Sequence, residues 1–162
     1  MISPKMQDAL NEQINAELFS SYLYLAMAAW FESVNLPGFA QWMMAQSREE
    51  NTHAMKLYKY LNDHGARVIL KAIAAPDAQY KSALDVFQQV LRHEQKVTGL
   101  IHKLYDLATR EKDYASEVEL QWFVKEQVEE EKNATDIVEK LKMVGDSKNA
   151  LLMIDHHMGA RK

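Results

Sequence analysis

Cysteine is absent from the 162 residues of this chain, which excludes disulfides and thiolate metal sites. Glycine and proline are scarce, with 5 and 3 residues, and this scarcity favours helix over most of the chain. No Lys/Arg run exceeds two residues, and a net charge of −4 argues against a nucleic-acid partner. The apolar run Leu23–Phe31 is too short to cross a membrane, and no signal-peptide region follows Met1. We therefore expect a soluble cytoplasmic protein with one domain over residues 1–162.

Helix start and stop signals divide the chain into four long segments and one short segment. Ser3 and Pro4 are typical of a helix start, and the residues from Asn35 to Gly38 end that first helix. Gly65 and Gly145 follow the ends of two later helices. The expected helices span about residues 4–33, 39–63, 82–110, 114–144 and 147–158.

The connections between these helices predict the topology. Short turns make the first and second helices antiparallel, and likewise the third and fourth. Residues 65–81 form a much longer connection between the second and third helices. This segment can reach roughly 55 Å when extended, whereas a helix of about 30 residues is roughly 45 Å long. We therefore predict an all-α four-helix bundle with one long crossover and a short fifth C-terminal helix.

Two sets of polar residues repeat one spacing along the chain. The first set is Glu17, Glu50 and His53, and the second set, 77 positions later, is Glu94, Gln127 and Glu130. In both sets the gaps are 33 and 3 residues, and every member lies on the apolar, inward face predicted for its helix. Because the midpoints of packed helices lie at the same height, the six side chains are expected to converge.

Several carboxylates in an apolar interior require compensating positive charge, because buried carboxylates are desolvated and repel one another. No Lys or Arg occupies the inward faces at this height. Oxygen ligands with one imidazole and no sulfur suit a pair of iron or manganese ions better than structural zinc. A single Glu at such a position is more often solvated surface, but six matched positions on apolar faces favour a metal site.

These residues, together with the crossover and the short fifth helix, resemble those of non-haem bacterial ferritins over essentially the full chain. The resemblance implies a ferritin-like bundle in which Glu17, Glu50 and His53 bind one iron. Glu50, Glu94 and Glu130 would bind a second iron, with Gln127 beside it. Gln127 replaces the second Glu-x-x-His expected in bacterioferritin. Asn51 stands where bacterioferritin has its haem-ligating methionine, so no haem is expected.

The resemblance also implies roles for residues around this pair. Glu49, Glu126, Glu129 and Glu130 would form a third iron site, although a solvated acidic face is the alternative. Tyr24 and Trp122 would donate electrons, although plain packing is the alternative for both. Glu117 matches one acidic position of a threefold iron pore in related proteins. Leu120 replaces the other acidic position, which argues against that entrance.

The function implied by the resemblance is iron storage with ferroxidase activity. Fe(II) would be oxidised by O2 or H2O2 and kept as a ferric mineral inside a hollow 24-subunit homo-oligomer. One alternative is a small di-iron oxidase or peroxidase resembling rubrerythrin, but the chain has a fifth helix and no cysteine-rich iron domain. The other is a storage subunit without oxidation, which the complete ligand set disfavours.

Overall fold

The computed structural model describes residues 2–162, and every regular element in this range is an α-helix. The all-α prediction is therefore confirmed, and the helix bounds agree with the sequence patterns to within two residues. The second helix begins two residues earlier than predicted because Pro37 fits the first helical turn. The helices are α1 (Pro4–Ser33), α2 (Pro37–Asp63), α3 (Ala83–Glu111), α4 (Tyr114–Val144) and α5 (Lys148–Met158).

Most helices begin with a side-chain cap that the sequence supplies locally. Ser3 accepts a hydrogen bond from the Met6 N–H at the start of α1. Other short polar side chains do the same for α3, α4 and α5, namely Ser82, Asp113 and Ser147. Such caps satisfy backbone donors that have no partner within the helix. Helix α2 is different, since Leu36 at its N-cap has no side-chain acceptor.

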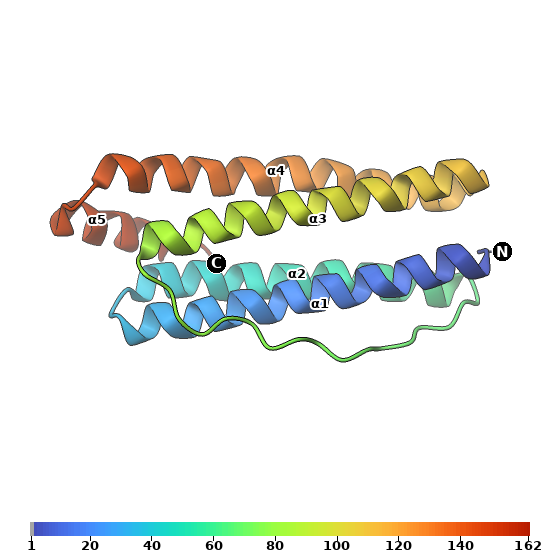
Figure 1. The fold of residues 1–162 in the computed structure, drawn as a ribbon, viewed down its shortest axis with the longest axis horizontal. Helices are drawn as coiled ribbons and strands as arrows, with labels where there is room; N and C mark the ends of the chain where they lie inside the picture. The colour runs from blue at the N-terminus through green and yellow to red at the C-terminus, as the bar shows by residue number, and fades with distance from the viewer. Residues whose placement is uncertain (1) are drawn as a thin grey trace.

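The long helices form a bundle with the predicted connectivity. Helices α1 and α2 pack as one antiparallel pair, and α3 and α4 pack as the other. The crossover after α2 runs along the outside of α1 to the opposite end of the bundle, as Figure 1 shows. This path makes α2 and α3 parallel. Helices α1 and α4, although far apart in the sequence, therefore also run in the same direction.

The crossover lies against α1 through hydrogen bonds to a buried asparagine. Asn11 Nδ2 donates to the Arg67 carbonyl oxygen at 3.0 Å, and Asn11 Oδ1 accepts from the Ile69 N–H at 2.8 Å. Gln7 Oε1 accepts from the Arg67 N–H at 3.2 Å. These bonds give the extended backbone partners that it cannot find in a helix or sheet. They explain how a long connection without regular structure keeps one path.

The interior consists of two apolar clusters separated by a polar layer. One cluster, which includes Phe31 and Phe87, fills the end of the bundle near α5. The other, which includes Leu10 and Ile101, fills the end near the N-terminus. The predicted polar residues occupy all four long helices between these clusters. The apolar packing on both sides therefore fixes the height at which the polar side chains meet.

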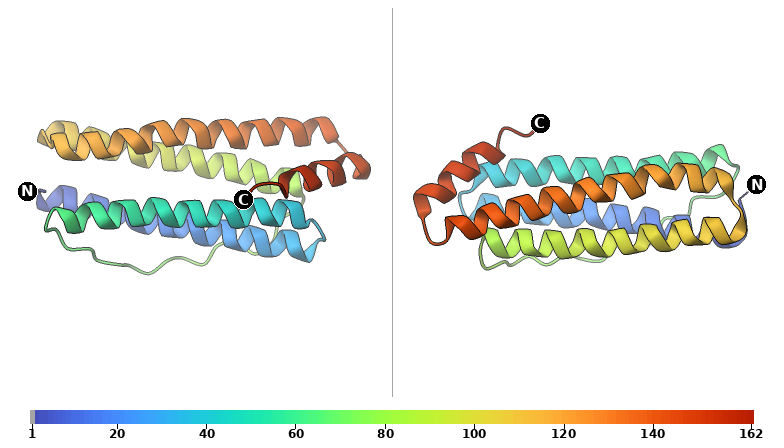
Figure 2. Two further views of the ribbon diagram at one scale, coloured as in Figure 1. Left: turned by 180° about the vertical axis from the view of Figure 1, so that it is seen from behind. Right: turned by 90° about the horizontal axis from the view of Figure 1, so that it is seen from above.

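The short fifth helix folds back onto its own bundle and completes the start of α2 (Figure 2). Asp155 Oδ1 accepts a hydrogen bond from the Phe39 N–H at 2.9 Å, so α5 supplies the cap that Leu36 cannot provide. The approach requires glycine at position 38, where an added Cβ would lie 1.6 Å from the Asp155 carbonyl oxygen. Met158 is buried against the bundle.

The helices of this bundle differ from membrane spans in hydropathy. Within residues 2–162, no helix is both long enough and apolar enough to cross a bilayer.

Candidate metal centre

The polar layer brings together all six residues of the repeated spacing. Each long helix contributes at least one of them, and all six are buried: Glu17, Glu50, His53, Glu94, Gln127 and Glu130. Two groups of three side chains offer ligand atoms that lie within 4.8 Å of one another. The first group is Glu17, Glu50 and His53, and the second is Glu50, Glu94 and Glu130. Glu50 belongs to both groups, so its carboxylate could be shared by two cations.

The first group is held by contacts along α1 and α2. His53 Nδ1 lies 3.1 Å from Glu50 Oε2 and 4.0 Å from Glu17 Oε2. Gln13, one turn before Glu17, donates from Nε2 to Glu17 Oε1 at 2.8 Å. The second oxygen of this carboxylate, Oε2, is buried and has no hydrogen-bond partner. An unpartnered buried carboxylate oxygen is costly in an apolar interior, and a bound cation would satisfy it.

The second group is tied to both helix pairs. The Tyr24 hydroxyl donates to Glu94 Oε1, and Gln127 Nε2 donates to Glu94 Oε2 at 3.1 Å. Gln127 also donates to the Glu94 backbone oxygen, so its amide nitrogen faces α3. The structure thus places Gln127 beside the second group, in contact with one of its carboxylates. Tyr24 is fully buried, and its hydroxyl has a carboxylate partner rather than only apolar neighbours.

A third group of ligand atoms lies on the outer side of the pair. It contains Glu49, His53, Glu126 and Glu130, again within 4.8 Å of one another. This set overlaps the third site implied by the resemblance, but His53 is included and Glu129 is not. Glu129 is exposed, and burial, followed by the charges of Glu49 and Glu129, raises the pKa of the Glu126 carboxyl. Its proposed part in a third site remains a prediction.

Trp122 packs against the imidazole that links the inner and outer groups. Its ring meets the His53 ring edge-on, with centroids 5.2 Å apart. Trp122 is also partly open to solvent, since it is 38% exposed. Lys56 Nζ lies 5.1 Å from the centroid of its ring. The indole is thus an aromatic wall of the site with access to solvent. Its role as an electron donor remains a prediction.

Burial and mutual repulsion raise the pKa of the clustered carboxyls. Burial, followed by the charge of Glu50, raises the pKa of Glu17 well above 4.5. The pKa of Glu50 is also raised well above 4.5 by burial and by its neighbours Glu94 and Glu130. For Glu130, burial and the charge of Glu94 raise the pKa to about 8. The centre therefore binds protons when it holds no cation, and a divalent cation would replace them.

Two glutamines that the sequence analysis gave no role support this centre. Gln13 precedes Glu17 by one helical turn, and Gln46 precedes Glu50 by the same four positions. Gln46 Nε2 donates to Glu50 Oε1 at 3.1 Å and to Glu130 Oε2 at 2.8 Å. The repeated Gln-x-x-x-Glu spacing was a signal available in the sequence. A third unassigned residue, Arg161, reaches the outer group from the C-terminal tail and has no such signal.

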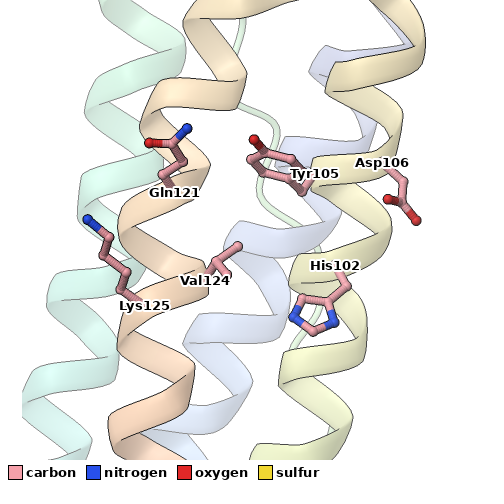
Figure 3. A pocket seen from close by; sticks show the side chains of 6 residues that line it. All are labelled: His102, Tyr105, Asp106, Gln121, Val124 and Lys125. Carbon is pink, nitrogen blue, oxygen red and sulfur yellow. The ribbon is translucent and has the colours of Figure 1, made fainter.

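A separate hollow lies between α3 and α4, away from these ligand groups. Figure 3 shows its lining, which comprises His102, Tyr105, Asp106, Gln121, Val124 and Lys125. No residue of the polar layer lines it. Within residues 2–162, the side chains arranged to hold a metal ion are confined to the three groups described above. The hollow is therefore not part of the candidate centre.

A bundle with one long crossover and a buried, carboxylate-rich pair of ligand groups defines the ferritin-like class of helical proteins. Comparison with known proteins agrees with this class. The family model for the ferritin-like domain matches residues 7–144. The chain therefore belongs to the ferritin-like domain family, and the resemblance seen in the sequence is confirmed.

Individual relatives cover the chain almost completely. The bacterial non-heme ferritin of Staphylococcus aureus (strain USA300) is 39% identical over 99% of this chain and 97% of its own length. The non-heme ferritin of Staphylococcus saprophyticus is 39% identical over 99% of this chain and 96% of its own. A solved structure of an open pore ferritin from the archaeon Archaeoglobus fulgidus is 49% identical, with a TM-score of 0.99 over 100% of both chains.

Proposed function

We propose that this protein is an iron-storage ferritin with ferroxidase activity. Its substrate is Fe(II), which is oxidised to Fe(III) and stored as a ferric mineral inside a hollow homo-oligomer of 24 subunits. The observation that carries the proposal is the pair of buried ligand groups that share Glu50. Membership of the family and the similarity to non-heme ferritins support iron as the cation.

The donor set matches the charge of two Fe(II) ions. The four carboxylates of the inner groups, when ionised, balance the four positive charges of two Fe(II) ions, while His53 binds as neutral imidazole. Oxidation adds two positive charges that these residues do not balance. Hydroxide or oxide from water would balance this excess and accompany Fe(III) as it moves to the mineral, which frees the centre for further Fe(II). The acidic outer group, with Glu49 and Glu126, offers the nearest next position.

The oxidant takes up the electrons in pairs. Two Fe(II) ions give up one electron each. Those two electrons and two protons reduce O2 to H2O2, or reduce H2O2 to two water molecules. Protons released from the carboxyls when iron binds are a local source for this step, because their pKa values are raised by burial. Tyr24 donates to Glu94 and Trp122 packs on His53, so both lie one contact from the ligands and are the proposed additional electron donors.

The proposal is tested by combining oxidation kinetics with the size of the particle. Metal-free protein is mixed with two equivalents of Fe(II) per chain in oxygenated buffer, and Fe(III) formation is followed by stopped-flow absorbance. Size-exclusion chromatography with iron analysis then measures how much iron travels with the protein. We expect rapid oxidation and a large, iron-loaded particle. Fast oxidation by a small particle that stores no iron would support the rubrerythrin-like alternative instead.

The cytoplasmic location expected from the sequence stays a prediction.

A further inference from the structure

After α5 the C-terminal tail lies beside the first part of α2 (Figure 2). At the end of α5, Gly159 packs against Gly38, and a Cβ at position 159 would lie 3.2 Å from the Gly38 Cα. Gln41 Nε2 donates to the Arg161 carbonyl oxygen at 3.3 Å. The backbone of the tail is therefore fixed against the N-terminal half of α2. This position directs the Arg161 side chain along α2 toward the polar layer.

Three side chains on one face of α2 hold the Arg161 guanidinium. Nη1 donates to Gln46 Oε1 at 2.8 Å, and Nη2 pairs with the Glu49 carboxylate. The guanidinium carbon lies 4.5 Å from the centroid of the Trp42 ring. Positions 42, 46 and 49 follow one helical face. Gln46 and Trp42 contact the guanidinium independently of Glu49, so these two residues also hold its positive charge near the centre.

Gln46 connects this guanidinium to the inner ligand groups. Its amide oxygen accepts from Arg161, while its amide nitrogen donates to Glu50 and Glu130. If the Gln46 amide were flipped, its oxygen would face the Glu50 and Glu130 carboxylates, and its NH2 group would face the donors of Arg161. Arg161 therefore favours the orientation in which Gln46 stabilises the ionised carboxylates. The tail thus contacts the inner pair through one buried side chain.

Glu49 connects the same guanidinium to the outer group. A cation held by Glu49, His53, Glu126 and Glu130 needs an oxygen of the carboxylate that Arg161 now pairs with. It would also lie close to a positive charge that Gln46 and Trp42 keep in place. Both effects weaken cation binding at this group, and neither acts directly on Glu17 or Glu94.

We propose that Arg161 is a positioning residue that competes with cations for Glu49. A cation in the outer group must share the Glu49 carboxylate with the guanidinium or displace it, so iron stays there briefly and the group serves as a transfer position rather than a store. This inference rests on the proposed function only in requiring that the inner groups bind Fe(II). The role of Arg161 itself follows from its contacts.

The test is equilibrium binding of Fe(II) without oxygen, measured by isothermal titration calorimetry on the assembled full-length protein. Arg161→Gln removes the charge and the fork of donors. Arg161→Lys keeps the charge. Lys162→Gln is the matched control, because it removes one positive charge from the neighbouring, exposed position. Melting temperature and particle mass are recorded for each variant, since a purely structural tail contact would change these and leave binding unaltered.

In Arg161→Gln we expect the third Fe(II) equivalent to bind about fivefold more tightly, the change expected from losing one partly exposed ion pair. The first two equivalents should change by less than the third, because Arg161 reaches the inner groups only through Gln46, and Lys162→Gln should match the wild type throughout. Arg161→Lys should stay near the wild type, since a charge remains beside Glu49. If two equivalents bind but the third is the same in Arg161→Gln and Lys162→Gln, this inference is wrong. If no variant and no wild-type protein binds Fe(II), the proposed function fails as well.

Discussion

Glu17 shows at the scale of one residue why we propose a cation in this core. One carboxylate oxygen accepts a hydrogen bond from Gln13, whereas the other is buried without a partner. The neighbouring carboxylate of Glu50 adds repulsion and raises the pKa of Glu17 further. A core selected for stability alone would hold apolar side chains here. The arrangement is therefore explained by binding rather than by folding.

Glu17→Ala and His53→Ala should each slow Fe(II) oxidation by at least about tenfold, because loss of even an outer support of a metal ligand costs that much. Stopped-flow absorbance of the metal-free proteins mixed with Fe(II) measures the rate. Glu12→Ala is the matched control, since Glu12 lies on the same helix but is exposed. Wild-type rates in both site variants would contradict the assignment of the centre.

The raised pKa of Glu130 predicts how the stability of the metal-free protein depends on pH. Folding raises this pKa from 4.5 to about 8, so the folded chain binds the proton more tightly than the unfolded chain. The resulting stabilisation is fully present below pH 4.5 and is lost as pH rises through about 8. The buried Glu17 and Glu50 carboxyls, whose pKa values are also raised, act in the same direction.

We therefore expect the melting temperature of the metal-free protein to fall between pH 5 and pH 8 on account of these groups. Glu130→Gln, which keeps the shape and cannot ionise, should flatten this fall and raise the melting temperature at pH 8. Scanning calorimetry of chelator-treated samples across the pH range measures both effects. A steeper fall in Glu130→Gln than in the wild type would contradict the assigned direction of the pKa shift.

At the scale of elements, the junction between α2 and α5 depends on close backbone approach. Gly38→Ala would place a methyl group 1.6 Å from the Asp155 carbonyl oxygen, so α5 must move and the Asp155 cap on Phe39 is weakened. We expect a loss of about 1–3 kcal/mol of stability, the usual cost of overpacking. Thermal denaturation of the metal-free protein measures it.

Gly99→Ala is the matched control for this junction. Gly99 also lies in a helix, but an added Cβ there meets nothing within 4 Å. Alanine favours helix over glycine by up to about 1 kcal/mol, so this variant should be at least as stable as the wild type. Equal melting temperatures for Gly38→Ala and Gly99→Ala would show that the contact between α2 and α5 is not tight in solution.

At the scale of the whole molecule, one chain leaves large apolar side chains uncovered. Leu70 on the crossover is 65% exposed, and Met153 on α5 is 74% exposed. Tyr22 and Leu25 on α1 are also exposed. Large apolar side chains that a single chain leaves exposed are often covered by subunit contacts. Copies of this chain would cover them in the proposed hollow oligomer.

Light scattering should therefore report a particle many times heavier than the 18.7 kDa chain. Deletion of residues 146–162 should lower the melting temperature or weaken assembly, because it removes α5 and the Asp155 cap of α2. The inner ligand groups lie on α1–α4, so rapid oxidation should largely remain. A monomer or simple dimer at micromolar concentration would contradict the hollow oligomer and favour the small di-iron oxidase.

The helices, their connectivity and the composition of the polar layer all follow from the order of residues along the chain. Helical periodicity assigns each residue to a face, and apolar neighbours show that the face is buried. For this reason the pattern of residues is enough to place Glu17, Glu50, His53 and Glu94 together. The length of the crossover likewise allows α2 and α3 to be parallel, as the structure has them.

Contacts made by segments without periodicity depend instead on how the whole chain packs. No spacing rule places Asp155 on the N–H of Phe39 or Arg161 on Glu49, since each pair lies more than a hundred residues apart. The orientation of individual carboxylates also depends on packing, which is why His53 rather than Glu129 completes the outer group. A periodic pattern records which face of a helix is buried, whereas the partner across an interface is chosen by how complete elements pack.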